Sequence, residues 1–496
     1  MSKTATEWRA LSASLDTPDE LFVDGQFEPA ASGQRFDTVD PATGETIAAV
    51  ARGGPADVDR AVDAARKSFV SGSWSQLTPA ERRAVLLTIA DAIDAKRDEL
   101  AALESVDGGK LVRDTVAFDI PGTAAILRWY AEAIDKVYGE VAPVGPGVLA
   151  VTTREPLGVI GAVVPWNFPI EMAMWKLAPA LAVGNSVVLK PAEQTPLSAL
   201  YFAELCRTSG LPDGVLNVIT GNGPEAGRAI GLHDDIDAVA FTGSTAIGKQ
   251  FLRYAADSNF KQVWPECGGK SANVVFDDIA DLDDVAEQAV VGAFACSGQV
   301  CSANSRLLVH RSRASDLIEA VVERTRQLKV GDPLDANSDL GPLISRSHRQ
   351  NVQGFIEKGR SEADLVTGGG VPTSVPSGGF YLEPTVFTNV APGSIIFDEE
   401  IFGPVLSVTV FDDEAEAIAL ANATQYGLAA SVFTDDLRRA HRVSQALQAG
   451  TVSINCVDAI DVTVPFGGFK QSGYGRDLSL HALEKYTGLK TRWFAP

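Results

Sequence analysis

Residues 158–191, GVIGAVVPWNFPIEMAMWKLAPALAVGNSVVLKP, decide the fold class of this chain. The stretch begins with the apolar run GVIGAVVP and ends with SVVLKP, and both runs are rich in the β-branched residues that strands favour. Between them, MAMWKLAPALAVG has the length and composition of a buried helix. A strand, a helix and a second strand in this order predict two parallel strands with a helix packed over them.

The same alternation continues along the chain as far as Asp277 and then resumes in the second half. Further strands are predicted at VLNVIT (215–220), AVAFTGS (238–244) and SANVVF (271–276), and further helices at 197–210 and 246–258. We therefore expect a parallel sheet covered by helices. A second α/β domain is predicted from helical patterns at 284–298, 314–328 and 414–423 and from strands at 305–310 and 429–434.

The N-terminal region and two extended segments complete the expected organisation. Residues 1–20 are interpreted as a mobile tail or a short helix, and LFVDGQF (21–27) as a strand with a turn at Asp24–Gly25. Helical patterns cover 56–69 and 79–103, the second capped by Thr78. VLAVTTREPLG near residue 150 and KYTGLKTRWF at 485–494 resemble edge strands that pair with another part of the chain or with another subunit.

Composition excludes several classes of function. The chain has 496 residues and a net charge of −22, so its surface repels phosphate backbones and a nucleic-acid partner is not expected. No apolar run reaches the ~20 residues of a membrane helix, and the polar N-terminus has no signal-peptide core, which predicts a cytoplasmic protein. Five scattered cysteines and five separated histidines predict neither a disulfide framework nor a metal site.

Cys301, in GQVCSANSR (298–306), is the strongest candidate for a nucleophile. Small polar residues and glycine surround it, and Ser302–Ser305 resemble the capped start of a helix. A helix N-terminus there would favour the reactive thiolate. Most free cysteines are instead small buried hydrophobes, and Cys206, Cys267 and Cys296 fit that interpretation.

Two further residues could complete a site around this thiol. Asn167 follows a predicted strand between Pro165 and Pro169, and its amide could donate to an oxyanion, although a turn-forming asparagine is equally compatible. Glu266 precedes two glycines that permit close backbone approach, and its carboxylate could activate water, although a solvated glutamate is the commoner case.

Two glycine patterns follow predicted strands and could receive phosphates. GNGPEAG (221–227) and GSTAIG (243–248) both open helices whose N-termini could hold a pyrophosphate. Neither is a clean dinucleotide fingerprint. The chain has no P-loop and no GxSxG elbow, which argues against a P-loop nucleotidase and against a Ser–His–Asp hydrolase.

Seven motifs in order resemble the aldehyde dehydrogenase superfamily. They are PWNFP, KPAEQTP, FTGS, ECGGKS, GQVCSANSR, EEIFGPV and PFGGFKQSG, and the likeness runs from about Leu21 to the C-terminus. The resemblance implies a Rossmann-like NAD-binding domain (1–136 and 157–266), an α/β catalytic domain (267–470) and a small β oligomerisation arm (137–156 and 478–496). It also implies a homodimer or homotetramer.

The resemblance further implies roles for individual residues. Cys301 would be the nucleophile, and Asn167 with the Cys301 N–H would form the oxyanion hole. Glu266 would be the general base for deacylation, and Lys176 would assist through a hydrogen-bond network near the site. NAD would bind through residues along a groove, with NADP also possible; a 2′-phosphate would meet the like charge of Glu193. These residues are Lys190 and Glu193 on the adenosine ribose, Glu400 and Phe402 at the nicotinamide ribose, and Val164, Pro165, Trp166, Gly223, Phe241, Gly243, Ser244 and Ile247 along the groove.

Within the superfamily, long segments resemble the γ-glutamyl-γ-aminobutyraldehyde dehydrogenases of putrescine breakdown. These segments include DIPGTAAILRWYAEAIDKVYGEVAP and GRDLSLHALEKYTGLKT. The branch implies an amine-bearing aldehyde, which Glu171, Asp458 and Asp461 could attract, whereas Ile460 adds bulk. General surface acidity would equally account for the acids. Neutral aliphatic, aromatic or betaine-type aldehydes, a coenzyme A-dependent variant and a non-enzymatic protein on this fold are the alternatives.

Overall fold

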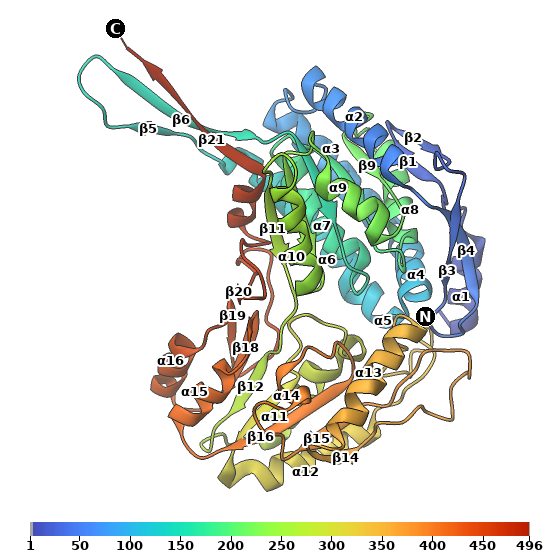
Figure 1. Cartoon of the computed structure of the whole chain (residues 1–496), viewed down its shortest axis with the longest axis vertical. Coiled ribbons are helices and arrows are strands. Elements are labelled where there is room, and N and C mark those ends of the chain that lie inside the picture. Colours follow the sequence, from blue (N-terminus) through green and yellow to red (C-terminus); the bar gives the residue numbers. More distant parts are fainter. Residues whose placement is uncertain (1–2, 496) are drawn as a thin grey trace.

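The chain folds around two seven-stranded sheets, with a three-stranded arm that projects from the body (Figure 1). The computed structural model describes residues 3–495. Residues 1–20, interpreted above as a tail or short helix, contain the helix α1 (Ala5–Ser14), which Thr4 caps. Within residues 3–495, no helix is both long and apolar enough to cross a bilayer.

The first sheet confirms the βα alternation predicted from residue 158 onward. Five neighbouring strands, from one edge of the sheet inward, are parallel, and the two N-terminal strands at the other edge form the predicted hairpin at Asp24–Gly25. In spatial order the strands are β11 (Gln262–Glu266), β10 (Ala238–Thr242), β7 (Val159–Val163), β8 (Ser186–Lys190), β9 (Leu216–Val218), β1 (Leu21–Val23) and β2 (Gln26–Glu28).

Helices cover both faces of this sheet because successive strand residues point to opposite sides. In β7, Ile160 and Ala162 join the core on one side, whereas Val159 and Val163 join the core on the other. The first core is built mainly from α3 (Pro79–Ala95), α4 (Arg97–Gly108), α6 (Ile120–Ala133), α7 (Pro169–Ala182) and α8 (Leu197–Thr208), and the second from α2 (Pro55–Ser71), α9 (Arg228–Leu232) and α10 (Thr245–Ala256). The single helix expected at 79–103 is broken at Lys96.

The second sheet is parallel except at β14. SANVVF, predicted beside the strands of the first half, forms β12 here and carries the chain from one sheet to the other. The strand order is β14 (Asp364–Thr367), β15 (Thr385–Thr388), β16 (Val405–Phe411), β13 (Arg306–His310), β12 (Ala272–Val275), β18 (Ala429–Phe433) and β19 (Thr451–Ile454), with helices α11 (Leu282–Phe294), α12 (Arg311–Gln327), α13 (Arg346–Gly359), α14 (Ile395–Asp398), α15 (Glu414–Asn422) and α16 (Leu437–Ala446) around them.

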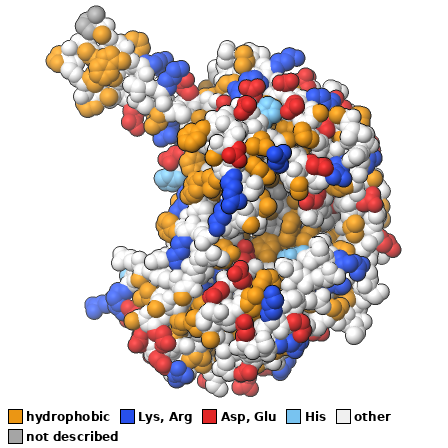
Figure 2. Space-filling model, in the orientation of Figure 1, with side chains coloured by type: hydrophobic (Ala, Val, Ile, Leu, Met, Phe, Trp, Pro, Cys, Tyr) orange, Lys and Arg blue, Asp and Glu red, His pale blue; other side chains and the backbone are white. Residues whose placement is uncertain are grey.

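The two extended segments predicted near residue 150 and at the C-terminus pair with each other in the arm. β21 (Thr487–Phe494) pairs antiparallel with β6 (Leu149–Pro156) along its full length, and β5 (Glu140–Ala142) adds a third strand. Apolar side chains are exposed on this arm, including Leu489, Trp493 and Phe494 (Figure 2). Two small pairs, β3 (Arg35–Val39) with β4 (Thr46–Ala51) and β17 (Tyr426–Gly427) with β20 (Phe469–Lys470), complete the strands.

Candidate active site

A pocket of about 480 Å³ lies between the two sheets, in the range of small-molecule sites. Figure 2 shows the face of the molecule hollowed between its two halves. The carboxyl ends of β7, β10 and β11 point to the pocket because these strands are parallel neighbours, and such edges are the usual ligand sites of α/β sheets. Each of these strands is followed by residues that line the pocket or adjoin it.

Cys301 lines this pocket from the second half of the chain. The helix α11 ends at Phe294, and Cys296, Ser297 and Gly298 all adopt positive φ, which turns the chain toward the pocket. The helix expected at Ser302–Ser305 is wrong: these residues form a turn and a loop that lead into β13, where Arg306 begins the parallel ladder.

The thiol therefore has no helix terminus to favour its thiolate. Burial and the nearby carboxylates of Asp458, Glu400 and Glu266 raise the pKa of Cys301 well above its ordinary value. The expectation that a helix terminus lowers the pKa of this thiol is thus also wrong. The hydrogen bond of the Ser302 backbone opposes this shift only in part.

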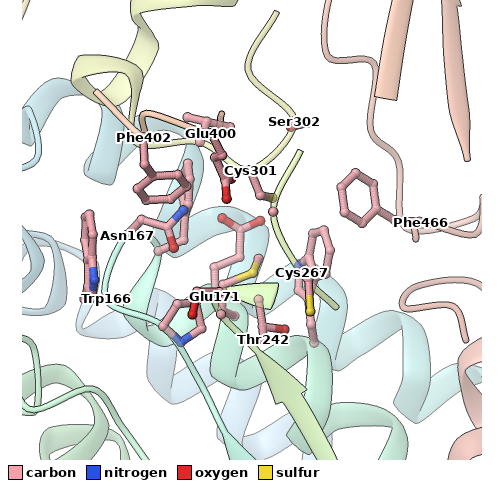
Figure 3. Close-up of a pocket in the computed structure, with 18 of the residues that line it drawn as sticks. Trp166, Asn167, Glu171, Thr242, Cys267, Cys301, Ser302, Glu400, Phe402 and Phe466 are labelled. Atoms are coloured by element: carbon pink, nitrogen blue, oxygen red, sulfur yellow. The ribbon is translucent and has the colours of Figure 1, made fainter. Parts of the chain in front are cut away.

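Asn167 lines the pocket beside Cys301, between Trp166 and Phe402 on the one side and the cysteine on the other (Figure 3). It belongs to the loop between β7 and α7, and its Nδ2 donates to the Gln299 carbonyl oxygen at 2.9 Å. The amide is therefore oriented by Gln299, which precedes Cys301 by two residues in the sequence. Trp166 and Phe402 meet edge to face, with ring centroids 5.3 Å apart.

Glu266 ends β11 and is buried directly behind the pocket. Neither carboxylate oxygen has a hydrogen-bond partner. Burial and Asp477 raise the pKa of Glu266 well above its ordinary value, whereas Lys176, Lys485 and Arg476 lower it. Lys176 itself does not line the pocket; its ammonium donates to Asp477, and both are fully buried.

The two glycines after Glu266 form a backbone surface that other parts of the site touch. A Cβ at Gly268 would lie 1.8 Å from Oε2 of Glu400, and one at Gly269 would lie 2.5 Å from the Cys301 carbonyl oxygen. The Gly269 N–H donates to Oε1 of Glu400 at 3.1 Å. Burial raises the pKa of Glu400 to about 7. Only glycine allows these close approaches. The sequence predicted close approach of this backbone to a ligand, whereas here the approaching atoms belong to Glu400 and Cys301.

The proposed cofactor residues divide into two sets. Six of them line the pocket: Pro165, Trp166, Gly243, Ser244, Glu400 and Phe402. The other six lie outside it along the same edge of the first sheet or at the start of the following helices: Val164, Lys190, Glu193, Gly223, Phe241 and Ile247. Lys190 Nζ and Glu193 Oε2 form an ion pair of 3.0 Å, and Ser244 caps α10.

The substrate residues also divide. Glu171, in the first turn of α7, and Asp458 and Ile460, in the loop after β19, line the pocket, whereas Asp461 does not. Asp461 is exposed and accepts a hydrogen bond from Thr463 Oγ1 at 2.6 Å. Met172, Trp175 and Phe466 also line the pocket and were not predicted; only their apolar character signalled burial.

Glu171 belongs to a group of charges that the sequence did not bring together. Glu104 of α4 and Asp119 face it from helices packed against α7, and Nζ of Lys110 lies 2.6 Å from Oδ2 of Asp119. Burial, followed by the negative charge of Asp119, raises the pKa of Glu171 to about 8, and Lys110 opposes the shift. We call Glu104, Lys110, Asp119 and Glu171 the acidic cluster.

Comparison with known proteins agrees with this geometry. The model of the aldehyde dehydrogenase family matches residues 27–492, and the chain belongs to this family. NADP/NAD-dependent aldehyde dehydrogenase PuuC of Escherichia coli (strain K12) is 51% identical over 98% of each chain, and an aminoacetaldehyde dehydrogenase of Pseudomonas aeruginosa is 49% identical over 98% of each.

Solved structures resemble this chain in both sequence and fold. A γ-glutamyl-γ-aminobutyraldehyde dehydrogenase from Burkholderia cenocepacia is 51% identical, with a TM-score of 0.97 over 99% of each chain. The indole-3-acetaldehyde dehydrogenase AldA of P. syringae, in complex with NAD+ and IAA, is 47% identical, with a TM-score of 0.98 over all of both chains. The predicted family, its fold and its likeness to the putrescine-breakdown branch are confirmed.

Proposed function

We propose that this aldehyde dehydrogenase oxidises ω-amino or γ-glutamylamino aldehydes to carboxylic acids with NAD. The observation that carries the proposal is the position of Glu171, which lines the same pocket as Cys301 and belongs to a cluster of three carboxylates with one lysine. Since the pKa of Glu171 is raised to about 8, an ammonium group entering the pocket would stabilise the ionised carboxylate and compensate the negative charge that then forms. Relatives named for aminoacetaldehyde and for γ-glutamyl-γ-aminobutyraldehyde support the same class of substrate.

Cys301 would form the covalent bond to the substrate. Because the pocket raises the pKa of the thiol, S–H adds across the aldehyde carbonyl: Sγ bonds to carbon and the proton ends on oxygen. Asn167 Nδ2 and the Cys301 N–H would donate to that oxygen as it loses the proton to solvent. Asn167 must then exchange its bond to the Gln299 carbonyl for one to the substrate.

The acyl group would be released by hydrolysis. NAD, when bound, supplies the acceptor for the hydride that leaves the substrate carbon, and a thioester on Cys301 remains. Glu266, whose carboxylate oxygens are unpaired, would take a proton from water as the water attacks the thioester. Cleavage of the C–S bond then releases the carboxylic acid, and the proton taken up by Glu266 passes to Sγ, which restores the thiol and the Glu266 carboxylate.

The residues of the groove fit a dinucleotide. Gly268 and Gly269 let the Glu400 carboxylate pack directly on the backbone at the edge of the pocket, and the N-terminus of α10 at Ser244 offers N–H groups to a pyrophosphate. Glu400 and Phe402 would hold the nicotinamide ribose, and Lys190 and Glu193 the adenosine ribose. Glu193 would repel a 2′-phosphate, so we prefer NAD to NADP. The remaining groove residues would be Val164, Pro165, Trp166, Gly223, Phe241, Gly243, Ser244 and Ile247.

The domain division predicted from the sequence follows the same assignment. We assign cofactor binding to residues 1–136 and 157–266, catalysis to 267–470 and assembly to 137–156 and 478–496. The exposed Leu489, Trp493 and Phe494 of the arm support a homodimer or homotetramer, because a monomer seldom exposes such a row of apolar side chains.

A comparison of matched aldehydes tests the proposal. The protein is mixed with NAD and 4-aminobutanal, 3-aminopropanal or the neutral butanal, and NADH formation is followed. We expect kcat/KM to be roughly tenfold higher for the cationic substrates, about 1.4 kcal/mol. Equal or better use of butanal or of phenylacetaldehyde would instead support a neutral substrate, which the apolar lining of Trp175 and Phe466 would favour.

A further inference from the structure

A second group of buried charges lies behind the pocket, on the side opposite to Glu171 on α7. Asp477 accepts hydrogen bonds from the ammonium groups of both Lys176 and Lys485, and none of the three side chains is more than 2% exposed. Lys176 belongs to α7 and Lys485 to a short 3-10 helix, Leu480–Tyr486. We call these three residues the lysine cluster.

Backbone pairing fixes this cluster against Glu266. Glu266 forms a β-bridge with Gly473, and Phe466 forms one with Asp477, so a single returning segment contacts both carboxylates. A Cβ at Gly467 would lie 2.9 Å from Oε1 of Glu266 and 3.0 Å from Cδ of Arg476, so nothing larger than glycine fits between them. The Glu266 carboxylate is thus packed close to the lysine cluster without a hydrogen bond of its own.

The charges of this region balance only when Glu266 is counted. Two lysines against one aspartate leave one positive charge in a fully buried group, and an uncompensated buried charge is costly. An ionised Glu266 removes the excess. Lys176 and Asp477 alone would already be neutral, so Lys485 is the residue that makes the cluster require a second carboxylate.

We propose that Lys485 is a positioning residue for thioester hydrolysis, whose charge keeps the buried Glu266 carboxylate ionised and able to accept a proton. The proposal rests on the proposed role of Glu266 as the base. Burial and Asp477 raise the pKa of Glu266, and Lys485 is among the three cations that lower it. The ionisable groups that face Glu266 are Lys176 from α7, Arg476 and Asp477 from the returning segment, Lys485 and Tyr486 from the 3-10 helix, Cys267 beside it and Cys301 across the pocket.

The test is the pH dependence of hydrolysis in a charge-deleted variant. Wild type, Lys485→Met and the charge-retaining Lys485→Arg are mixed with NAD and 4-aminobutanal, and the turnover that follows the first burst of NADH is measured across pH. In Lys485→Met we expect the rising limb to move up by about one pH unit, which lowers turnover roughly tenfold on its acid side. The burst itself should be retained, and Lys485→Arg should keep the wild-type midpoint.

Two results would overturn the proposal. One is a rising limb of the pH profile of turnover whose midpoint is the same in Lys485→Met as in wild type. The other is an equal loss of burst and turnover at every pH with a lower unfolding temperature, which would mean that Lys485 only supports the fold. If Lys485→Met does not fold, Asp477→Asn is compared with the double variant Asp477→Asn, Lys485→Met: the added substitution should again raise the midpoint, and no difference between the two would reject the idea.

Glu266→Gln separates this proposal from the one on which it rests. A burst followed by nearly arrested turnover supports Glu266 as the base. If Glu266→Gln turns over like wild type, the assignment of the base is wrong and the role of Lys485 fails with it. If Glu266→Gln is arrested but Lys485→Met keeps the wild-type midpoint, only the role of Lys485 is wrong.

Discussion

Two groups of buried charges adjoin one pocket, and they are unbalanced in opposite directions. The acidic cluster sets three carboxylates against Lys110, and the pKa of Glu171 there is raised to about 8. The lysine cluster sets two ammonium groups against Asp477, whose pKa is lowered. α7 contributes one member to each, Glu171 and Lys176. If both proposals hold, one helix prepares the pocket for a cation on one side and stabilises a carboxylate on the other.

The largest effect is expected from removing the thiol that both clusters would serve. Cys301→Ala should lower turnover by roughly 10⁴-fold or more, because it removes the thiol that we propose to form the thioester. Cys206→Ala, a buried thiol of α8, is the matched control and should keep its activity. Substantial NADH formation by Cys301→Ala would show that neither cluster acts through this cysteine.

Next in size is the loss of the oxyanion donor. Asn167→Ala should lower kcat by about 10²–10³-fold, since one preorganised amide is removed from the developing charge. The measurement is the rate of the NADH burst, with unfolding temperature as the control. A fall in stability with an unchanged burst would assign Asn167 to the fold alone, through its bond to Gln299.

A smaller change should follow from neutralising the acidic cluster. Glu171→Gln should lower kcat/KM for 4-aminobutanal roughly tenfold and leave butanal unaffected, because only the cation loses a charge partner. In wild type the preference for the cation should grow as pH rises through about 8, since the Glu171 carboxylate becomes ionised there. If wild type and Glu171→Gln prefer 4-aminobutanal over butanal to the same degree at every pH, the acidic cluster has no role in substrate choice.

The smallest expected effect is on stability. The pKa of Glu171 is raised on folding, so the folded state holds a proton that the unfolded state has lost, and stability falls as pH rises from about 4.5 to about 8. Glu104, with a pKa also raised to about 8, adds to this fall. Glu171→Gln should therefore unfold roughly 2–4 °C higher than wild type near pH 8 and show a flatter profile. If Glu171→Gln and wild type show the same dependence of unfolding temperature on pH, the raised pKa of Glu171 is contradicted.

The sequence predicted β7, β8, β9 and β10 of the first sheet because these strands are short and apolar, but it did not predict β11, which carries Glu266. It failed at Ser302–Ser305, where small polar residues that resemble a helix cap instead form the loop before β13. The local sequence pattern cannot tell a helix start from such a loop, because the pairing of the following strand, β13, with β12 and β16 decides which one forms. The pattern also gave no reason to expect a break at Lys96 or the placement of SANVVF in the second sheet.

The site was predicted where motifs are local and missed where they are not. Cys301, Asn167 and Glu171 all line the pocket, but the resemblance supplied what spacing alone could not. The lysine cluster joins residues about 300 positions apart, and no short pattern announces such a pairing. The raised pKa of Cys301 was missed for the same reason, since it depends on Asp458, Glu400 and Glu266, which only the fold assembles.

The glycine at 268 has a consequence for how this pocket can change. Its backbone lies so close to Glu400 that any side chain there would displace the carboxylate, and the Ser472 hydroxyl fastens its carbonyl at 2.7 Å from behind. At Gly268 the pocket is therefore bounded by backbone alone, so no side chain can be shortened or lengthened there. Changes in the shape of this pocket by substitution are therefore confined to positions that carry side chains, such as Glu171, Trp175 and Ile460, while the backbone at Gly268 stays as it is.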